Sequence, residues 1–499
     1  MTNKTFIQPL DRIAIGLILL LSLAIGLVIL QGDAVKPSVR NFSWQNQQIG
    51  ADDTSFSLTF SRPMDTKSAE DNLKIDPPLA GKVSWAGRRM VYTLVTPAPY
   101  GTPYKVQLQG ARDKFSEKEG KKKTIEAFTG TFRTRDRVMI YIGADKEELG
   151  RLVLYNLTQE QKKLLTPKDL VVMDFHPYPD GEKILFSART TQTQDLLSGQ
   201  LYTTTTGIST ESGKPVEPAG KVDLVIDNKE YQVLKFDLSP DGQTIVLQRG
   251  NRKNPSDFGL WFMSAVKSDS GEVSKAQRIK SDQVGDFSIT PDSKAVAVSQ
   301  GQGAAILPLQ PDGTKPLDFL PQFGVVQAFA KDGSQAAMVK FNTDYTRDLF
   351  LVTNQGSQKL LLRTTPNGSI VNCQFDPASP TLYCLLTQLI PGGQFIEQPY
   401  VVAIDIKTGQ QKPLLVLPPE QRNVQISLAP DGLGLLFDQV VPLINGIPSP
   451  RTLTTDDGQP IASSSLWLMP LLPIADAAAT ADIKPEQLPL SGFHPRWLP

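Results

Sequence analysis

Short segments with alternating apolar and polar residues run along most of the chain. "SFSLTF" at Ser55–Phe60 and "TIVLQ" at Thr244–Gln248 are typical, and Gly, Pro and Asp separate such segments from one another. Alternation with a period of two predicts strands that bury one face, whereas apolar positions spaced for an amphipathic helix are scarce. The pattern therefore predicts an all-β protein.

One segment breaks the pattern, because Ile13–Leu30 holds eighteen residues without a charge. A helix of that length nearly spans a hydrocarbon core of about 30 Å. We therefore expect residues 1–12 to be a short cytoplasmic segment, residues 13–31 to be a transmembrane anchor, and the bulk of a single-pass bacterial membrane protein to be extracytoplasmic. The alternative is a signal peptide cleaved near the weak site Gly32-Asp33-Ala34.

Residues 37–135 contain about seven short strands spaced for an antiparallel β-sandwich. The motifs "FSRPMD", "PPLAGKVSW", "YGTPYKV" and "FRT" occur here in order, and with them the segment resembles the SbsA-type bacterial Ig-like domain. The resemblance implies a spacer or adhesion-like module. Matching positions are Phe60, Pro63, Met64, Asp65, Pro78, Gly81, Trp85, Gly101, Thr102, Tyr104, Val106, Phe132 and Thr134. We assign Trp85 to the sandwich core rather than to a binding surface.

The turn Ser-Pro-Asp-Gly occurs in "FDLSPDGQTIVL", Phe236–Leu247, and recurs as imperfect repeats along most of the chain. Pro presets φ at the second turn position, Asp bonds nearby backbone N–H groups, and Gly supplies a positive φ. Each copy therefore predicts a strand–turn–strand hairpin. The six copies place an Asp or its equivalent at positions 180, 241, 292, 332, 378 and 431.

Two weaker strands follow each hairpin, and four strands per repeat of about 50 residues is typical of a β-propeller blade. Residues 137–167 supply three strands without a first, and "GFHPRWLP" at Gly492–Pro499 supplies a first strand without the rest. Joining them predicts a seventh blade that closes the ring. The repeat resembles the TolB-type, WD-like propeller family over residues 137–499.

Charge and cysteine content narrow the picture further. The 51 basic and 51 acidic residues balance, so no global field favours nucleic acid as a partner. The two cysteines, Cys373 and Cys384, face one another across the fifth predicted hairpin. In an oxidising compartment they form either a disulfide or a pair of packed thiols, and neither arrangement is catalytic.

Motifs for chemistry are missing from the sequence. The turn aspartates Asp180, Asp241, Asp292, Asp332 and Asp431 are spread around a ring rather than gathered as cation ligands. His176 and His494 fall on inner strands of neighbouring blades, but two histidines do not make a zinc site. With no nucleophile elbow or phosphate loop, we expect no catalytic, metal or cofactor site and no enzymatic activity.

These features favour a membrane-anchored binding or scaffold protein that presents its propeller to other proteins of the bacterial envelope. Long connections at residues 190–199, 207–221, 389–398 and 440–464 are candidate contact loops, and the last holds an apolar, Pro-rich segment. Its candidate contact residues are Pro442, Leu443, Ile444, Pro448, Pro450 and Arg451. The alternative is carbohydrate or peptidoglycan recognition through aromatic residues, namely Trp261, Tyr345 and Trp467.

Overall fold

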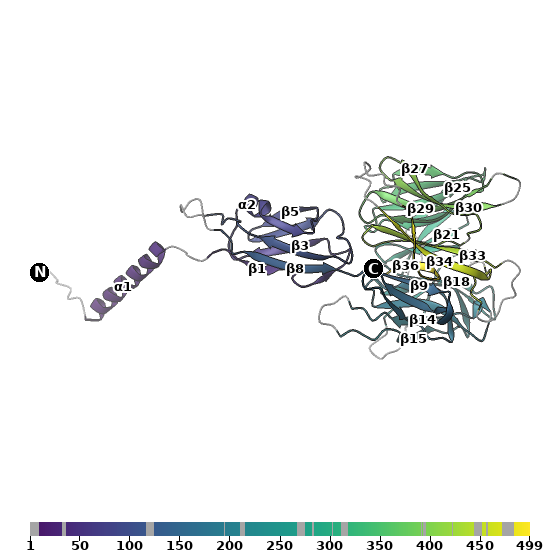
Figure 1. Ribbon diagram of the computed structural model, residues 1–499, viewed down its shortest axis with the longest axis horizontal. Helices are drawn as coiled ribbons and strands as arrows, with labels where there is room; N and C mark the ends of the chain where they lie inside the picture. The colour runs from purple at the N-terminus through teal and green to yellow at the C-terminus, as the bar shows by residue number, and fades with distance from the viewer. Residues whose placement is uncertain are drawn as a thin grey trace. The chain divides into compact units, whose positions relative to one another are not determined.

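A computed structural model shows a chain built almost entirely of β-strands (Figure 1). It describes residues 9–31, 36–115, 124–193, 195–209, 215–266, 275–281, 284–301, 303–310, 318–390, 392, 396–421, 423–443, 452–455, 458–471 and 484–499. Two compact units can be separated by their internal contacts. The first comprises residues 1–45, 55–93 and 104–131, and the second comprises residues 46–54, 94–103 and 132–499.

Eight strands before residue 135 form two four-stranded sheets. The first sheet has the order β1 (Val39–Phe42), β3 (Ser55–Phe60), β6 (Arg89–Leu94), β5 (Gly81–Ala86). The second has the order β2 (Gln48–Ile49), β8 (Phe128–Thr134), β7 (Pro103–Leu108), β4 (Leu73–Asp76). In the first unit the rings of Phe42 on β1 and Phe128 on β8 meet edge to face at 6.0 Å, so aromatic side chains join the two sheets.

Trp85 is half-buried on β5 rather than inside the core. Its ring stacks on Phe60 at 5.7 Å, and its Nε1 donates to Glu70. The short helix α2 (Thr66–Asp71) begins at Asp65, whose carboxylate accepts a hydrogen bond of 2.7 Å from the Ser68 N–H. Such capping satisfies a backbone donor that the first helical turn leaves free.

From residue 138 onward the described residues form seven further sheets of four strands each. In each sheet the strands lie in chain order, except that the C-terminal strand completes the first sheet. The sheets are β11 (Gln161–Leu164), β10 (Leu152–Asn156), β9 (Val138–Gly143), β36 (Gly492–Trp497); β12 (Leu170–Pro177), β13 (Lys183–Thr190), β14 (Gln200–Thr205), β15 (Val222–Ile226); β16 (Tyr231–Leu238), β17 (Thr244–Asn251), β18 (Phe258–Ser264), β19 (Gln277–Ile279); β20 (Phe287–Ile289), β21 (Ala295–Gln300), β22 (Gly303–Pro308), β23 (Asp318–Leu320); β24 (Val325–Phe329), β25 (Gln335–Phe341), β26 (Arg347–Thr353), β27 (Gln358–Arg363); β28 (Ser369–Phe375), β29 (Thr381–Leu389), β30 (Glu397–Asp405), β31 (Gln411–Val416); and β32 (Ile426–Leu428), β33 (Gly434–Pro442), β34 (Ile461–Pro470), β35 (Glu486–Gln487). This is the architecture of a β-propeller. Two single-turn 3₁₀ helices, Lys146–Glu148 and Leu196–Ser198, lie in connections.

The recurring turn joins the first and second strands of a sheet, as its chemistry requires. Asp241 accepts hydrogen bonds from the Ser239 hydroxyl at 2.6 Å and the Gln243 N–H at 2.9 Å, and Gly242 has a φ of 70°. The Asp side chain and the positive φ together reverse the chain within four residues.

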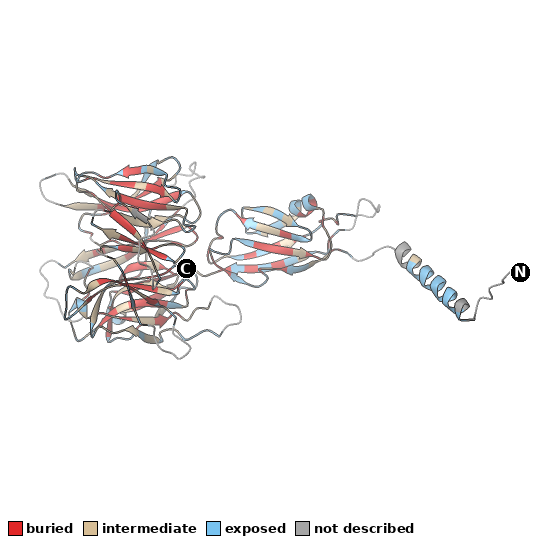
Figure 2. Ribbon diagram, turned by 180° about the vertical axis from the view of Figure 1, so that it is seen from behind, coloured by how far each residue is buried: buried red, intermediate tan, exposed pale blue. Residues whose placement is uncertain are grey.

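Buried apolar residues fill the spaces between neighbouring sheets (Figure 2, red). One such cluster joins Leu349 of β26 to Leu382 of β29, and another joins Tyr383 of β29 to Phe437 of β33. Separate clusters of this kind also join the sheet that contains β36 to the β12–β15 sheet and to the β32–β35 sheet.

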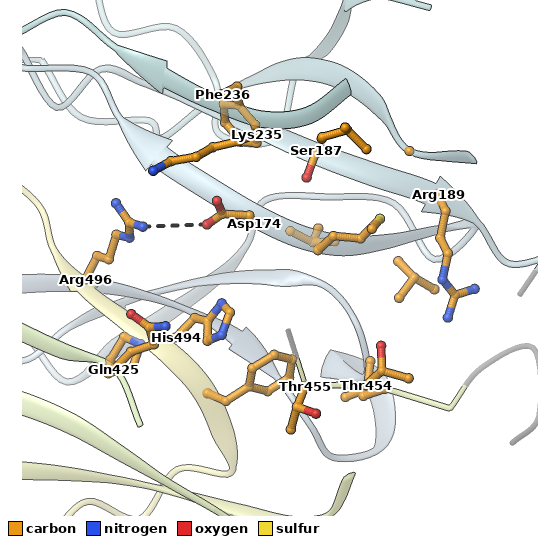
Figure 3. A pocket seen from close by; sticks show the side chains of 18 of the residues that line it. Asp174, Ser187, Arg189, Lys235, Phe236, Gln425, Thr454, Thr455, His494 and Arg496 are labelled. Carbon is orange, nitrogen blue, oxygen red and sulfur yellow. Dashed lines mark ion pairs between the residues drawn. The ribbon is translucent and has the colours of Figure 1, made fainter. Parts of the chain in front are cut away.

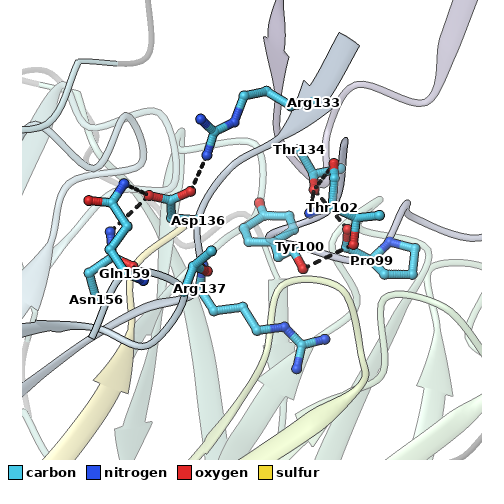
Figure 4. A network of polar contacts seen from close by, with 10 residues as sticks. Pro99, Tyr100, Thr102, Arg133, Thr134, Asp136, Arg137, Asn156 and Gln159 are labelled. Carbon is cyan, nitrogen blue, oxygen red and sulfur yellow. Dashed lines mark hydrogen bonds and ion pairs between the residues drawn. The ribbon is translucent and has the colours of Figure 1, made fainter. Parts of the chain in front are cut away.

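The C-terminal strand β36 pairs antiparallel with β9, so the two ends of the propeller segment share a sheet (Figure 1). Polar contacts hold the start of this sheet. Asp136 accepts a hydrogen bond of 2.8 Å from Asn156 and pairs with Arg133 (Figure 4). Arg137 pairs with the turn residue Asp431 at 3.2 Å. The start of β9 is therefore tied both to its own sheet and to the neighbouring β32–β35 sheet.

The predicted transmembrane anchor is wrong. A helix does form, α1 (Pro9–Gln31), but among the residues that the structure describes no helix is long and apolar enough to cross a bilayer. The predicted localisation, a single-pass membrane protein with an extracytoplasmic bulk, depends on this anchor and is therefore also wrong.

Candidate functional site

A cavity of about 580 Å³ lies where the inner strands of five propeller sheets meet (Figure 3). Consecutive residues of the inner strands β12, β16 and β36 line it, together with residues of β28, Gln425–Ser427 at the start of β32, and Ser187 and Arg189 of β13. Two loops add Leu197 and the segment Leu453–Thr455. The volume is within the range of about 300–1,000 Å³ typical of ligand sites.

β-Bulges shift the register of the inner strands beside this cavity. The pairing of four inner strands skips one residue each, namely Met173, Leu234, Gln327 and Val371. A bulge re-aims the side chains on either side of it. Beyond the bulge, Asp174 and Lys235 lie on the face of their strands that lines the cavity.

Four charged side chains form a network at one wall of the cavity. His176 Nδ1 lies 3.2 Å from Asp237 Oδ1, and His176 Nε2 lies 3.8 Å from Asp174 Oδ2. Arg496, on the C-terminal strand, lies 3.6 Å from Asp174 and 3.3 Å from His176 Nδ1. The network therefore connects β12 to β16 and β36.

The pKa values follow from these contacts. Burial on its own raises the pKa of Asp174, but hydrogen bonding from His176 and the Arg496 charge lower it well below that of an ordinary aspartate. Burial and Arg496 lower the pKa of His176, yet the two carboxylates outweigh them and the net pKa is raised. Asp174 and Asp237 therefore favour the protonated form of His176.

Other inner strands make equivalent polar contacts with the next strand around the ring. The Gln374 amide donates to Ile426 O and accepts from the Leu428 N–H, both at 2.8 Å. Ser427 Oγ accepts from the Trp497 N–H at 3.1 Å, and Lys235 pairs with Asp286. The inner edge of each sheet faces the centre of the propeller, where no further strand pairs with it. These side chains satisfy backbone groups on that edge.

Asp438 lies behind this wall and is fully buried. Its two oxygens accept hydrogen bonds of 2.7 Å from the backbone N–H groups of Gln425 and His494. Burial raises the pKa of Asp438 to about 6, although the hydrogen bonds and His494 oppose the rise. The carboxylate joins β36 to β32 and stabilises His494 in a left-handed conformation with a φ of 51°.

Exposed apolar side chains lie in the cavity lining and near the N-terminal ends of neighbouring inner strands. Leu197 and Leu234 line it and are each 45% exposed, and Val371 (47% exposed) precedes the lining residue Asn372. Phe341 lies against Gly324 where the inner strand β24 begins, and Tyr345 O accepts from the Asn367 N–H before β28. We call Leu197, Leu234, Phe341, Tyr345 and Val371 the apolar rim.

The structure places the candidate residues from the sequence in different environments. Tyr345 is 73% exposed, but Trp261 is buried and Trp467 stacks on Phe437, so these two tryptophans are core residues. In the candidate contact loop, Pro442 ends β33 and Leu443 is exposed, whereas Ile444, Pro448, Pro450 and Arg451 lie outside the described residues. The same insertion returns as Leu453–Thr455, which lines the cavity.

The cysteines are joined, with Sγ atoms 2.07 Å apart. Cys373 and Cys384 pair across β28 and β29 and point into the core between two sheets. Cys373 lies between Asn372 and Gln374, which face the cavity. The disulfide thus stiffens one wall of the site.

Sequence reasoning missed Asp174, Asp237 and Arg496, because no motif marks them. They could have been found by aligning the hairpins on their turns, which places His176, Asp237 and Arg496 at equivalent inner-strand positions. The site as a whole is a rigid polar cavity in a β-propeller, surrounded by apolar side chains.

Comparison with solved structures shows similarity of fold. The chain is similar to TolB from Acinetobacter baumannii, with 13% identity over 86% of this chain and 83% of that chain and a TM-score of 0.38. It is also similar to the periplasmic gluconolactonase PpgL of Pseudomonas aeruginosa, with 12% identity over 73% and 99% of the two chains and a TM-score of 0.44. No family and no curated protein matches the sequence. Likenesses of this size carry no argument about function, and the propeller follows from the strand pairing.

Proposed function

We propose that the protein is a noncatalytic binding module whose seven-bladed propeller, closed by its C-terminal strand, receives a segment of a partner protein at the cavity. The observation that carries the proposal is the combination of a 580 Å³ polar cavity with an apolar rim of exposed side chains. Strands position most of the lining groups, which reduces the entropy lost on binding.

The apolar rim favours a protein as the partner rather than a small solute. Exposed apolar groups gathered at one place on a soluble protein mark interaction surfaces. Aromatic residues such as Tyr345 and Phe341 are enriched among the residues that dominate protein binding. The polar cavity would then give orientation and specificity to the segment that enters it.

The test is site-specific photocrosslinking followed by measurement with a purified partner. A photoreactive residue at Leu234 should capture one defined protein, whereas the same residue at Val266 should not. Val266 is 52% exposed and lines a separate cavity, so it is a matched control. Leu234→Asp combined with Tyr345→Ser should then weaken the purified complex at least about tenfold, and Val266→Asp should leave it unchanged.

Equal capture at both positions would contradict the proposal. Binding of a glycan that is lost in Tyr345→Ala, with no protein captured at Leu234, would favour carbohydrate recognition instead.

A further inference from the structure

The lining of the cavity has an excess of positive charge. Among the described lining residues, Arg189, Lys235 and Arg496 are basic and Asp174 alone is acidic. The nearby carboxylates Asp237 and Asp286 are outside the lining, where they pair with His176 and Lys235. The whole chain is neutral, so this excess is a local property of the site.

The three cations surround the cavity from two sides. Figure 3 shows Arg496 and Lys235 on one side of the pocket and Arg189 on the other. Arg189 is 3% exposed and is anchored by hydrogen bonds to Thr193 O at 2.6 Å and Thr452 O at 3.2 Å. Its position is therefore set by the fold before any ligand enters.

Arg496 has capacity to bind a further group. Its contacts with Asp174 and His176 are 3.6 and 3.3 Å long, beyond the usual 2.7–2.9 Å of a charge-assisted hydrogen bond. A guanidinium carries five N–H donors in a planar fork that matches a carboxylate.

We infer that the segment received by the cavity is an extended, acidic polypeptide, with one of its carboxylates bound between Arg496 and Lys235. The inference rests on the function proposed above and specifies the chemistry of the partner. Apolar residues flanking the acidic ones would pack on Leu234 and Leu197 at the rim. The amides of Asn372 and Gln425, which also line the cavity, suit the backbone of an extended chain.

A nucleic acid fits this site less well, although it too is anionic. Its affinity comes from many phosphate contacts along an exposed basic surface. Here three cations lie in one recess within an apolar rim.

The test uses the full-length protein and labelled peptides of one length, in which two leucines flank six Glu, six Gln or six Lys residues. By fluorescence anisotropy the Glu peptide should bind at least about tenfold more tightly than the Gln peptide and weaken as salt rises. The Lys peptide should not bind. Lys235→Gln should weaken Glu-peptide binding about fivefold.

Lys221→Gln is the matched control. Lys221 is 61% exposed, pairs with Glu217 as Lys235 pairs with Asp286, and lines a different cavity. It should leave the affinity unchanged, and circular dichroism should show both variants folded.

Each outcome separates this inference from the proposed function. If the Gln peptide binds as tightly as the Glu peptide and Leu234→Asp weakens both, the acidic specificity is overturned and the binding function stands. If a single-stranded oligonucleotide binds more tightly than the Glu peptide and Lys235→Gln weakens it, a nucleic acid is the better ligand. If no peptide binds and Leu234 captures no protein, both proposals fail.

Discussion

Asp438 shows how one buried carboxylate joins two inner strands at a cost in stability. The Asp438 carboxylate accepts two backbone hydrogen bonds, which favour its charged form. Burial nevertheless raises its pKa to about 6. The charge is retained because both partners are N–H donors, which a neutral side chain of the same shape cannot both satisfy.

Asp438→Asn should change the pH dependence of unfolding. With a folded pKa near 6 and an unfolded value near 3.8, wild-type stability falls as pH rises between these values, and the full cost is present above about pH 6. The pKa difference corresponds to about 3 kcal/mol. In urea titrations at pH 4 and pH 7, wild type should therefore lose more stability than the variant. Parallel pH profiles would contradict the assignment.

His176 should act in the opposite sense. Its folded pKa is raised by Asp174 and Asp237, so the stability it contributes is complete below its unfolded pKa of about 6.5 and is lost as pH rises through the folded value. His176→Gln should therefore destabilise the protein by on the order of 1 kcal/mol at pH 6 and by less at pH 9. Thermal unfolding of both proteins across this range measures the difference, and a constant difference would refute the ion pair.

At the scale of elements, closure depends on β36. This strand pairs with β9 as the fourth strand of its sheet, and it carries Arg496, which contacts Asp174 of β12 in the next sheet. The chain therefore closes through backbone pairing within one sheet and through side chains to the next.

Trp497→Ala tests the closing strand. Trp497 is 7% exposed in a cluster with Met139, Tyr141 and Leu436. Truncating such a ring should cost about 3–5 kcal/mol in chemical denaturation. Trp85→Ala is the control in the sandwich and should leave the propeller transition unchanged. A loss below about 1 kcal/mol for Trp497→Ala would mean that β36 does not close the ring.

The disulfide should contribute modestly, because β28 and β29 are already paired in a sheet. It links residues 11 apart in sequence, and a short loop gives the lower part of the usual stabilisation of about 2–4 kcal/mol. Cys373→Ala with Cys384→Ala should cost about 2 kcal/mol without changing the fold, as measured by urea unfolding against wild type. A loss above about 5 kcal/mol would contradict this account.

Much of the fold could be predicted because turn chemistry is local. Pro, Asp and Gly at one hairpin require the same backbone wherever they recur, so the copy at Asp241 indicates the others, and the unfinished copy at the C-terminus indicates β36. The cavity could not be predicted in the same way. Asp174, Asp237 and Arg496 meet only through the ring, and bulges such as the one at Leu234 change which side chains face inward.

Two predictions from the sequence were wrong, and the local pattern of apolar and polar residues did not contain the reason in either case. A run of apolar residues indicates a helix, and α1 forms, but among the residues that the structure describes no helix is long and apolar enough to cross a bilayer. Trp261 was a candidate surface aromatic, yet it packs between Tyr231 and the cationic side chains of Arg249 and Arg278. Aromatic residues in strands are core residues unless a neighbour leaves them uncovered.

At the scale of the whole propeller, the two ends of the inner strands differ in character. The recurring turns at the C-terminal ends are polar and saturated by their own Asp side chains, as at Asp241 and Asp332. The N-terminal halves carry the bulges and the exposed apolar side chains, and the cavity extends from there along the strands to Lys235 and Arg496. Binding is therefore expected at one end of the channel.

Hydrogen exchange of the complex with the captured partner, or with the Glu peptide, tests this claim most directly. The account predicts slower exchange at residues 231–236, 341–347 and 369–374, with no change at the turns 239–243 and 331–334. Protection of the turns, with unchanged exchange at the N-terminal ends of the inner strands, would contradict it.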